Sequence, residues 1–318
     1  MTADPERSEP LAAGARPSSA PRFGAEPAAR AEPRFDSLLP AEMAGRAEEV
    51  GRRKVELDAV TTFWLAVLAG AFIALGAIFA TTVSAGGASA PYGIVRLLSG
   101  VAFSLGLILV VVGGAELFTG NTLIVMAWAN RKVRTRSLLR NWLIVYAGNL
   151  VGAVATAIVA FVSGQYLFGG GSVGLAALAS ASAKTSLDPI AAVALGMLCN
   201  ALVCLAVWLT FSARTTTDRV LAIVPPIAAF VAAGFEHSVA NMYFIPVGLL
   251  IRGFAPASFW AAIGKTAADY PSLTLQGLVG NLVPVTIGNI IGGAVMVGIV
   301  YWFIYLRSSA RSNRFSRR

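Results

Sequence analysis

Long apolar segments, separated by short polar connections, account for most of the chain from residue 60 onward. A helix needs about 20 apolar residues to cross the hydrocarbon core of a bilayer, and each segment reaches that length. The segments lie at 60–83, 97–129, 141–163, 188–211, 220–250 and 279–306. The pattern predicts an all-α membrane protein with six transmembrane helices, in a domain that covers residues 58–307.

The second and fifth segments are longer than one crossing requires, and small and polar residues interrupt each near its middle, at 113–121 and 234–241. Glycine weakens a helix, and charged side chains are costly at membrane depth. Irregular backbone is tolerated at that depth only where protein or a water-filled cavity surrounds it. We therefore predict that helices 2 and 5 are interrupted and face the middle of the protein.

The two interruptions share one sequence pattern. Each contains Gly-x-Glu and then, after four further residues, Asn, with an offset of 120 residues between Glu116 and Glu236 and between Asn121 and Asn241. A second pattern, Gly-Asn-x-x-Gly, occurs at 148–152 and 288–292. Small residues also recur by chance in packed transmembrane helices, but both patterns fall at equivalent positions of a 3+3 arrangement. Because three is odd, the halves must insert in opposite senses, which predicts an inverted repeat with the solute path between the interrupted helices.

Charge adds an orientation to this picture. Charged residues make up 13% of the chain, about half the usual share in soluble domains, and the mean hydropathy is +0.71. The net charge of +9 does not indicate a nucleic-acid partner, because the basic residues flank the apolar segments. Of these, 21 lie in the two tails and the connections after segments two and four, against 4 in the other connections. The positive-inside rule then predicts a multi-pass protein of the inner (plasma) membrane with both termini cytoplasmic.

The two ends of the chain have a different composition. Residues 1–57 are rich in Ala, Pro, Arg and Glu, contain 9 basic and 10 acidic residues, and lack the apolar run of a signal peptide. We expect a disordered cytoplasmic tail that becomes helical over 39–54, and a plain solvated extension is favoured over a regulatory role. Residues 308–318 are expected to form a short basic cytoplasmic tail.

His237 is the single histidine of the chain and lies in the second interruption. Imidazole titrates near pH 6.5, so this side chain could exchange a proton with a weak acid near neutral pH. A permeating carboxylate could promote protonation of His237, take the proton and continue as the neutral acid. The alternative is a buried histidine that serves only as a structural hydrogen-bond partner.

The other polar side chains at depth have a structural alternative as well. Glu116 and Glu236 are expected to accept hydrogen bonds from backbone N–H groups that the interruptions free, because a fixed negative charge in the path would repel an anion. Thr119 and Asn200 are neutral donors that could orient an oxyanion, or could join helices as buried polar contacts.

An enzymatic function is not expected. Catalysis requires a nucleophile and a base within reach of each other, or several metal ligands, and one histidine supplies neither. No metal, no cofactor and no nucleic acid are predicted as partners. A channel for water, glycerol or ammonia is a rival hypothesis, and the absence of paired Asn-Pro-Ala motifs weighs against its aquaporin version.

Residues 114–121 and 234–242 closely resemble the two signatures of the formate/nitrite transporter family, and 283–293 looks like its last helix. The resemblance covers about 55–307 and is strongest to the formate channels, although Gly120-Asn121 stand where family members differ. It implies an aquaporin-like helical fold, a homopentamer with one pore per protomer, and passage of formate or a closely similar small monovalent anion. Nitrite and hydrosulfide would satisfy the same pore.

The resemblance also implies roles for individual residues. His237 would be the central pore histidine, Thr119 the threonine of the interrupted second helix and Asn200 the asparagine that bonds near the histidine. Lys184 would attract anions through its positive charge. The resemblance further implies two apolar constrictions, which would be formed by Phe103, Leu107, Leu117, Phe118 and Phe230. These constrictions would strip water from the substrate and penalise a bare anion.

Overall fold

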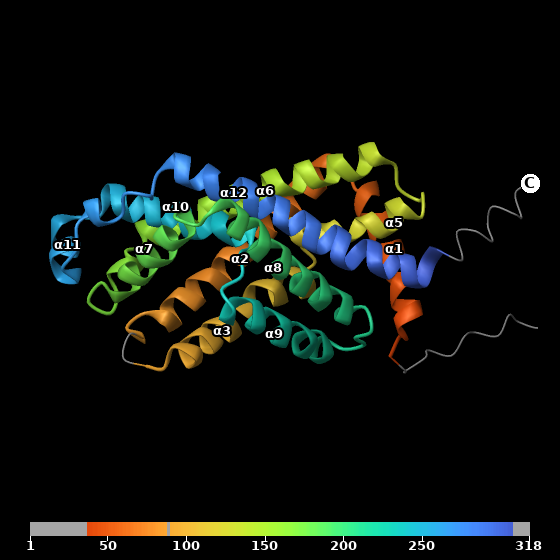
Figure 1. The fold of residues 1–318 in the computed structure, drawn as a ribbon, viewed down its shortest axis with the longest axis horizontal. Helices are drawn as coiled ribbons and strands as arrows, with labels where there is room; N and C mark the ends of the chain where they lie inside the picture. The colour runs from red at the N-terminus through yellow and green to blue at the C-terminus, as the bar shows by residue number, and fades with distance from the viewer. Residues whose placement is uncertain (1–36, 88–89, 308–318) are drawn as a thin grey trace, which may run out of the picture. The chain divides into compact units, whose positions relative to one another are not determined.

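The computed structural model describes residues 37–87 and 90–307, and within these ranges every regular element is a helix. The longer elements are drawn in Figure 1. In chain order the α-helices are α1 (Pro40–Glu56), α2 (Ala59–Ser84), α3 (Tyr92–Gly113), α4 (Phe118–Asn121), α5 (Val125–Ala129), α6 (Thr135–Val162), α7 (Ser172–Thr185), α8 (Pro189–Thr210), α9 (Thr216–Ala232), α10 (Ser238–Phe254), α11 (Ala257–Ile263) and α12 (Leu275–Ile290). The 3₁₀ turns are η2 (Thr122–Ile124), η3 (Gln165–Leu167) and η4 (Ala267–Asp269), and the π-helical stretches η5 (Ile291–Ile299) and η6 (Trp302–Leu306) continue α12.

The six predicted apolar segments are all helical. In the described part of the chain, α2, α3, α6, α8 and the continuous rod from Leu275 to Leu306 are each long and apolar enough to cross a membrane. The second segment is divided into α3 and the short run α4–η2–α5, and the fifth is divided into α9 and α10. Both predicted interruptions are therefore present.

The inverted repeat is visible in how the helices pack. Helix α2 crosses α6, and its repeat partner α8 crosses α12 and its continuation, each at a glycine. A Cβ atom added at Gly152 would overlap the Val67 carbonyl oxygen, and one added at Gly292 would overlap that of Met197. Small residues let transmembrane helices approach to backbone contact. The Gly-Asn-x-x-Gly pattern of the sequence thus marks the two equivalent crossings.

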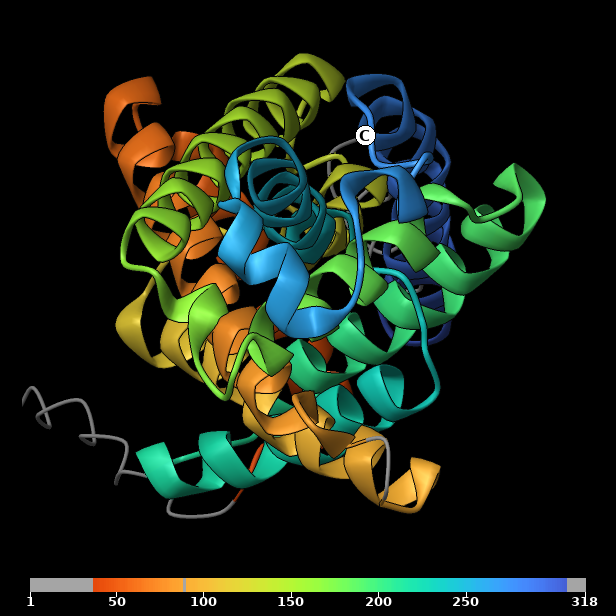
Figure 2. The same cartoon turned by 90° about the vertical axis from the view of Figure 1, so that its left-hand side faces the viewer.

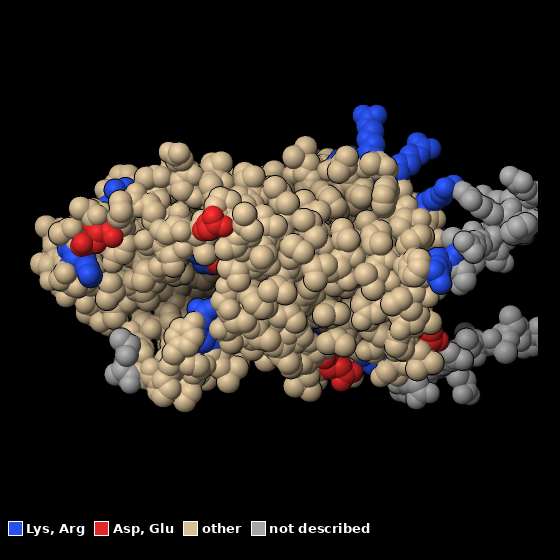
Figure 3. Space-filling view, in the orientation of Figure 1, with Lys and Arg blue, Asp and Glu red and all other residues tan. Residues whose placement is uncertain are grey.

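The described unit has two distinct ends. Helix α1, the end of the last helix and the connection between α5 and α6 lie at one end, and α7 and α11 lie at the other (Figure 1). Figure 2 shows the unit from the α7 and α11 end, with the helices gathered into one bundle. In Figure 3 basic side chains project from the α1 end, and most of the surface between the ends is uncharged.

Helix α1 changes the predicted boundary of the N-terminal tail. Residues 40–56 form an ordered helix whose small and apolar face, including Met43, Ala44 and Ala47, is buried against α5 and α8 residues. The buried Glu48 carboxylate pairs with Lys132 at 2.8 Å. The compact unit therefore begins at Ser37 rather than at residue 58, because a stripe of small residues supplies the helix with a packing face. The remainder of the predicted tails, 1–36 and 308–318, lies outside the described residues.

Candidate functional site

Each interrupted helix stops at a glycine in the left-handed region. Gly114 has φ +77° after α3, and Gly234 has φ +76° after α9. A left-handed residue ends a helix by turning the chain away from its axis, and glycine adopts this conformation without a Cβ clash. The next helical elements begin only at Phe118 and Ser238, so two short extended stretches lie between helix ends in the interior of the bundle.

Two asparagines satisfy the backbone at these stretches. Asn149 Oδ1 accepts the Phe118 N–H at 2.9 Å, and its Nδ2 donates to the carbonyls of Ala66 and Glu116 at 2.7 and 2.9 Å. Asn289 repeats this pattern with Ser238, Gly196 and Glu236 at 2.8–2.9 Å. Buried backbone groups without partners are costly, so these amides hold both interruptions in place. The sequence marked them only as repeat positions.

The two glutamates play a different part from the predicted one. Glu116 accepts from the Asn121 Nδ2 and pairs with Lys54 Nζ, both at 2.6 Å. Glu236 accepts from the Asn241 Nδ2 at 2.6 Å and pairs with Lys184 Nζ at 2.8 Å. The N–H groups of Phe118 and Ser238 donate to the asparagines of α6 and α12, and those of Glu116 and Glu236 donate to the carbonyls of Leu65 and Leu195. The carboxylates instead neutralise one lysine on each side of the interruptions.

Between the two interruptions, Thr119 and His237 meet at the centre of the unit. Thr119 Oγ1 lies 3.0 Å from His237 Nε2, and both side chains are buried. His237 Nδ1 accepts the Ala240 N–H at 3.0 Å and so caps α10. Since Nδ1 acts as an acceptor, the neutral ring carries its proton on Nε2 and directs it toward Thr119.

Asn200 supports Thr119 rather than touching the imidazole. Its Nδ2 lies 3.3 Å from the Thr119 carbonyl, 3.2 Å from Thr122 Oγ1 and 2.6 Å from the Asn289 carbonyl. A side chain at Gly293 would collide with this amide, so the glycine leaves room for it. Asn200 thereby ties the start of α4 to α12.

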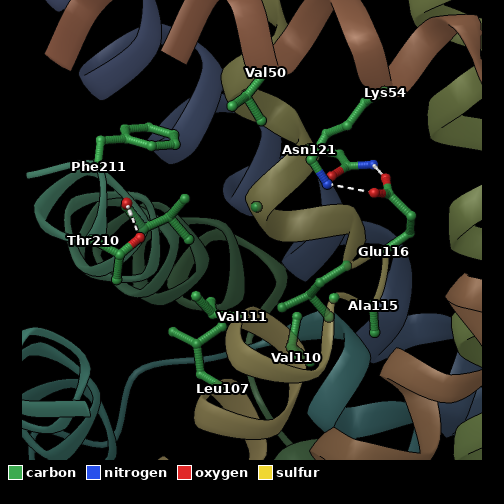
Figure 4. A pocket seen from close by; sticks show the side chains of 14 residues that line it. Val50, Lys54, Leu107, Val110, Val111, Ala115, Glu116, Asn121, Thr210 and Phe211 are labelled. Atoms are coloured by element: carbon green, nitrogen blue, oxygen red, sulfur yellow. Dashed lines mark hydrogen bonds and ion pairs between the residues drawn. The ribbon is translucent and has the colours of Figure 1, made fainter. Parts of the chain in front are cut away.

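Two cavities flank the Thr119–His237 contact. The α1-side cavity, of about 220 Å³, is lined by residues of α1, α3, the first interruption and α8. Figure 4 shows Lys54, Glu116 and Asn121 on one part of its wall and Leu107, Val110 and Val111 on another. The α7-side cavity, of about 80 Å³, is lined by residues of α2, α3, α7, α9 and α10 and includes His237.

Four of the five predicted constriction residues line these cavities. Leu107 and Leu117 line the α1-side cavity, and Phe103 and Phe230 line the α7-side cavity. The Phe230 ring stacks on the His237 ring at 6.0 Å between centroids. Apolar side chains therefore form part of the wall of both cavities.

Phe118 differs from the prediction. Its ring packs edge-on against Tyr146 and Trp142 of α6, at 4.9 and 6.1 Å between centroids, and lines neither cavity. Leu117 has extended backbone, so consecutive side chains project in different directions and only Leu117 reaches the α1-side cavity. The sequence alone did not reveal this alternation.

Lys184 lies where its charge could reach a solute, but it is not free. It pairs with Glu236, and its ammonium lies 5.3 Å from the centre of the Phe244 ring. Two further cations not predicted from the sequence, Lys54 and Arg96, line the α1-side and α7-side cavities respectively. Lys54 and Lys184 are the same residue type at equivalent positions of the two repeats. This match could have revealed Lys54 from the sequence.

Comparisons with known proteins agree with this architecture. The formate/nitrite transporter family profile matches residues 41–303. The formate channel FocA of Escherichia coli is 47% identical over 281 residues, which cover 88% of this chain and 99% of FocA. The FocA of Haemophilus influenzae is 42% identical and covers 83% of this chain and 93% of its own length.

A solved structure described as a pentameric formate channel with formate bound superposes with a TM-score of 0.75 at 47% identity. The match covers 78% of this chain and 98% of that one. The residues that the family profile matches include both interruptions. The chain belongs to the formate/nitrite transporter family.

Proposed function

We propose that this chain conducts formate, or a closely similar small monovalent anion such as nitrite, across the inner membrane. The observation that carries the proposal is the buried contact between Thr119 and His237, which lies between two cavities at the meeting point of the interrupted helices. Formate is favoured over nitrite or hydrosulfide because the curated relatives described above are formate channels.

The central contact is suited to a small acid–anion pair. The Nε2–H of His237 and the Thr119 hydroxyl can donate to a carboxylate oxygen, while the surrounding apolar walls disfavour a bare charge. The energetic cost of crossing the constriction is therefore lower when formate takes up a proton and crosses as formic acid. An imidazolium form of His237 would need a proton on Nδ1, which would then face the Ala240 N–H. Proton exchange at this ring thus requires that the cap of α10 be released.

The orientation and assembly belong to the same proposal. Basic residues at the α1 end favour a cytoplasmic location for that end and for both termini, with the α7-side cavity open to the outside. The pentameric relative supports a homopentamer with one pore in each protomer. Lipid then covers only the outer helices.

The test is a flux assay with purified protein in liposomes, using formate, nitrite, hydrosulfide, acetate and glycerol at several external pH values. We expect formate flux to exceed glycerol flux and to rise as external pH falls, because more protons are available to cross with formate at His237. His237→Asn should lose the pH-dependent component, and asparagine is a good helix N-cap, so α10 should remain capped. Equal flux of glycerol and formate would contradict the proposal.

A further inference from the structure

The two cavities are related by the inverted repeat, position by position. Eight of the residues that line the α1-side cavity have partners 120 or 130 positions away that line the α7-side cavity. The pairs are Val50 with Ser180, Lys54 with Lys184, Val110 with Phe230, Val111 with Val231, Ala115 with Phe235, Leu117 with His237, Gly120 with Ala240, and Thr210 with Ala80. A residue that lines one cavity without a partner in the other therefore marks a difference between the two sides.

Arg96 is such a residue. It lies in the first half of α3 and lines the α7-side cavity, whereas Thr216, its repeat partner at the start of α9, does not line the α1-side cavity. The same cavity contains Lys184 and His237. The guanidinium is thus one of the groups that an anion meets before it reaches the central contact.

The cations of the two cavities differ in how they are neutralised. Lys54 and Lys184 each pair with a glutamate, at 2.6 and 2.8 Å. Arg96 contacts only backbone carbonyls at the end of α9: its Nη2 donates to Val231, and its Nε lies 3.4 Å from the Ala232 carbonyl oxygen. Among residues 37–87 and 90–307, no carboxylate forms an ion pair with it. The lysine–glutamate pairs cancel on both sides, and the α7-side cavity retains one positive charge.

We propose that Arg96 captures the substrate anion at the α7-side cavity and makes capture from that side stronger than capture from the α1 side. This inference rests on the proposed function and adds to it a residue and a direction. The guanidinium retains free N–H donors in a planar arrangement that matches a carboxylate or nitrite. Leu117 and the neutralised Lys54–Glu116 pair offer the anion no equivalent charge on the other side.

The alternative is a purely structural role in which Arg96 only caps α9, since basic side chains commonly satisfy the last carbonyls of a helix. Two substitutions separate these roles. Arg96→Gln removes the charge, whereas Arg96→Lys keeps the charge and loses the two-point contact with Val231 and Ala232. Lys265→Gln, an exposed residue near the same end that lines neither cavity, removes one charge as the matched control.

The experiment measures initial rates of labelled formate uptake against concentration, in spheroplasts and in inverted membrane vesicles. One unit charge acting over about 8 Å in a partly hydrated cavity changes local anion occupancy about fivefold. We expect Arg96→Gln to raise KM about fivefold in spheroplasts only, with the maximal rate within about twofold of the parent. Arg96→Lys and Lys265→Gln should stay within about twofold, and added salt should raise the parent KM more than that of Arg96→Gln.

The inference is overturned if Arg96→Gln leaves KM unchanged, raises it equally in both preparations, or is matched by Arg96→Lys. The last result would assign Arg96 to capping alone. Thermal melting of each purified variant identifies any loss of fold. A parent protein that carries no formate would defeat the proposed function itself, and that outcome is distinct from all of these.

Discussion

At the scale of single residues, the two nitrogens of His237 have separate tasks. Nδ1 accepts the Ala240 N–H and fixes the ring at the start of α10, and Nε2 faces Thr119. The ring is held by a backbone donor on one side and a hydroxyl on the other, so its orientation is defined before substrate arrives. The repeat partners of His237 and Thr119 are Leu117 and Val239. Both are apolar, so their side chains cannot form this hydrogen bond.

Thr119→Val tests the hydroxyl alone. Valine has nearly the same shape and already stands at the repeat-equivalent position 239, so we expect the fold to persist. Loss of one hydrogen bond to the substrate and the ring is worth about 1.4 kcal/mol, which corresponds to about a tenfold fall in formate flux. Flux in liposomes measures the effect. The control is Thr82→Val, at an exposed threonine near the end of α2. Unchanged flux would show that the hydroxyl takes no part.

Much of the site was predictable from residue type and position. A lone histidine and a threonine in the two interrupted segments are unusual enough to be singled out, and the two side chains lie 3.0 Å apart. Three-dimensional direction was not predictable: Phe118 turns toward α6, and the two glutamates turn toward lysines on helices far away in sequence. Arg96 was missed because a basic residue at the start of a span ordinarily reports only topology.

At the scale of elements, apolar length and small-residue spacing predicted all six apolar helical segments and both interruptions, because membrane helices must satisfy their own backbone. Helix α7 was not predicted. Its sequence, rich in Ala and Ser, is neither long nor apolar enough to span a membrane, and the helix is held by packing on α10, α2 and α12. A helix was expected over 39–54, but the packing of α1 against the bundle was not predicted.

The glycine crossings should be sensitive to a single methyl group. We expect Gly152→Ala and Gly292→Ala each to destabilise the protein by about 1–3 kcal/mol, because the added Cβ would overlap a carbonyl of the facing helix. Gly45→Ala in α1 is the matched control: nothing lies within 4 Å of its added Cβ, and alanine favours a helix. Thermal unfolding in detergent compares the three. Equal melting temperatures for all variants would refute close contact at the crossings.

At the scale of the whole molecule, two equivalent ion pairs join the halves to their flanking helices. Lys54 connects α1 to the first interruption, and Lys184 connects α7 to the second. The side chains of Glu116 and Glu236 are only 6% and 7% exposed, so each depends on its lysine for compensation. The pairs hold α1 against the first interruption and α7 against the second.

Lys54→Gln should therefore leave a buried carboxylate unpaired and cost about 2 kcal/mol of stability. The double variant Lys54→Gln/Glu116→Gln removes both charges and should recover most of this loss. Lys184→Gln, alone and with Glu236→Gln, should behave alike if the halves are equivalent. Melting temperatures in detergent provide the measurement, and a double variant less stable than its lysine single variant would contradict this account.

The central contact joins two different side chains, one from each half of the repeat, and this limits how such a protein can be encoded. Thr119 comes from the first half and His237 from the second, and the equivalent position in the other half holds an apolar residue in each case. Two separate copies of either half, assembled back to back, would bring together two imidazoles or none. Linking two diverged halves in one polypeptide allows a hydroxyl and an imidazole to occupy opposite sides of the same axis.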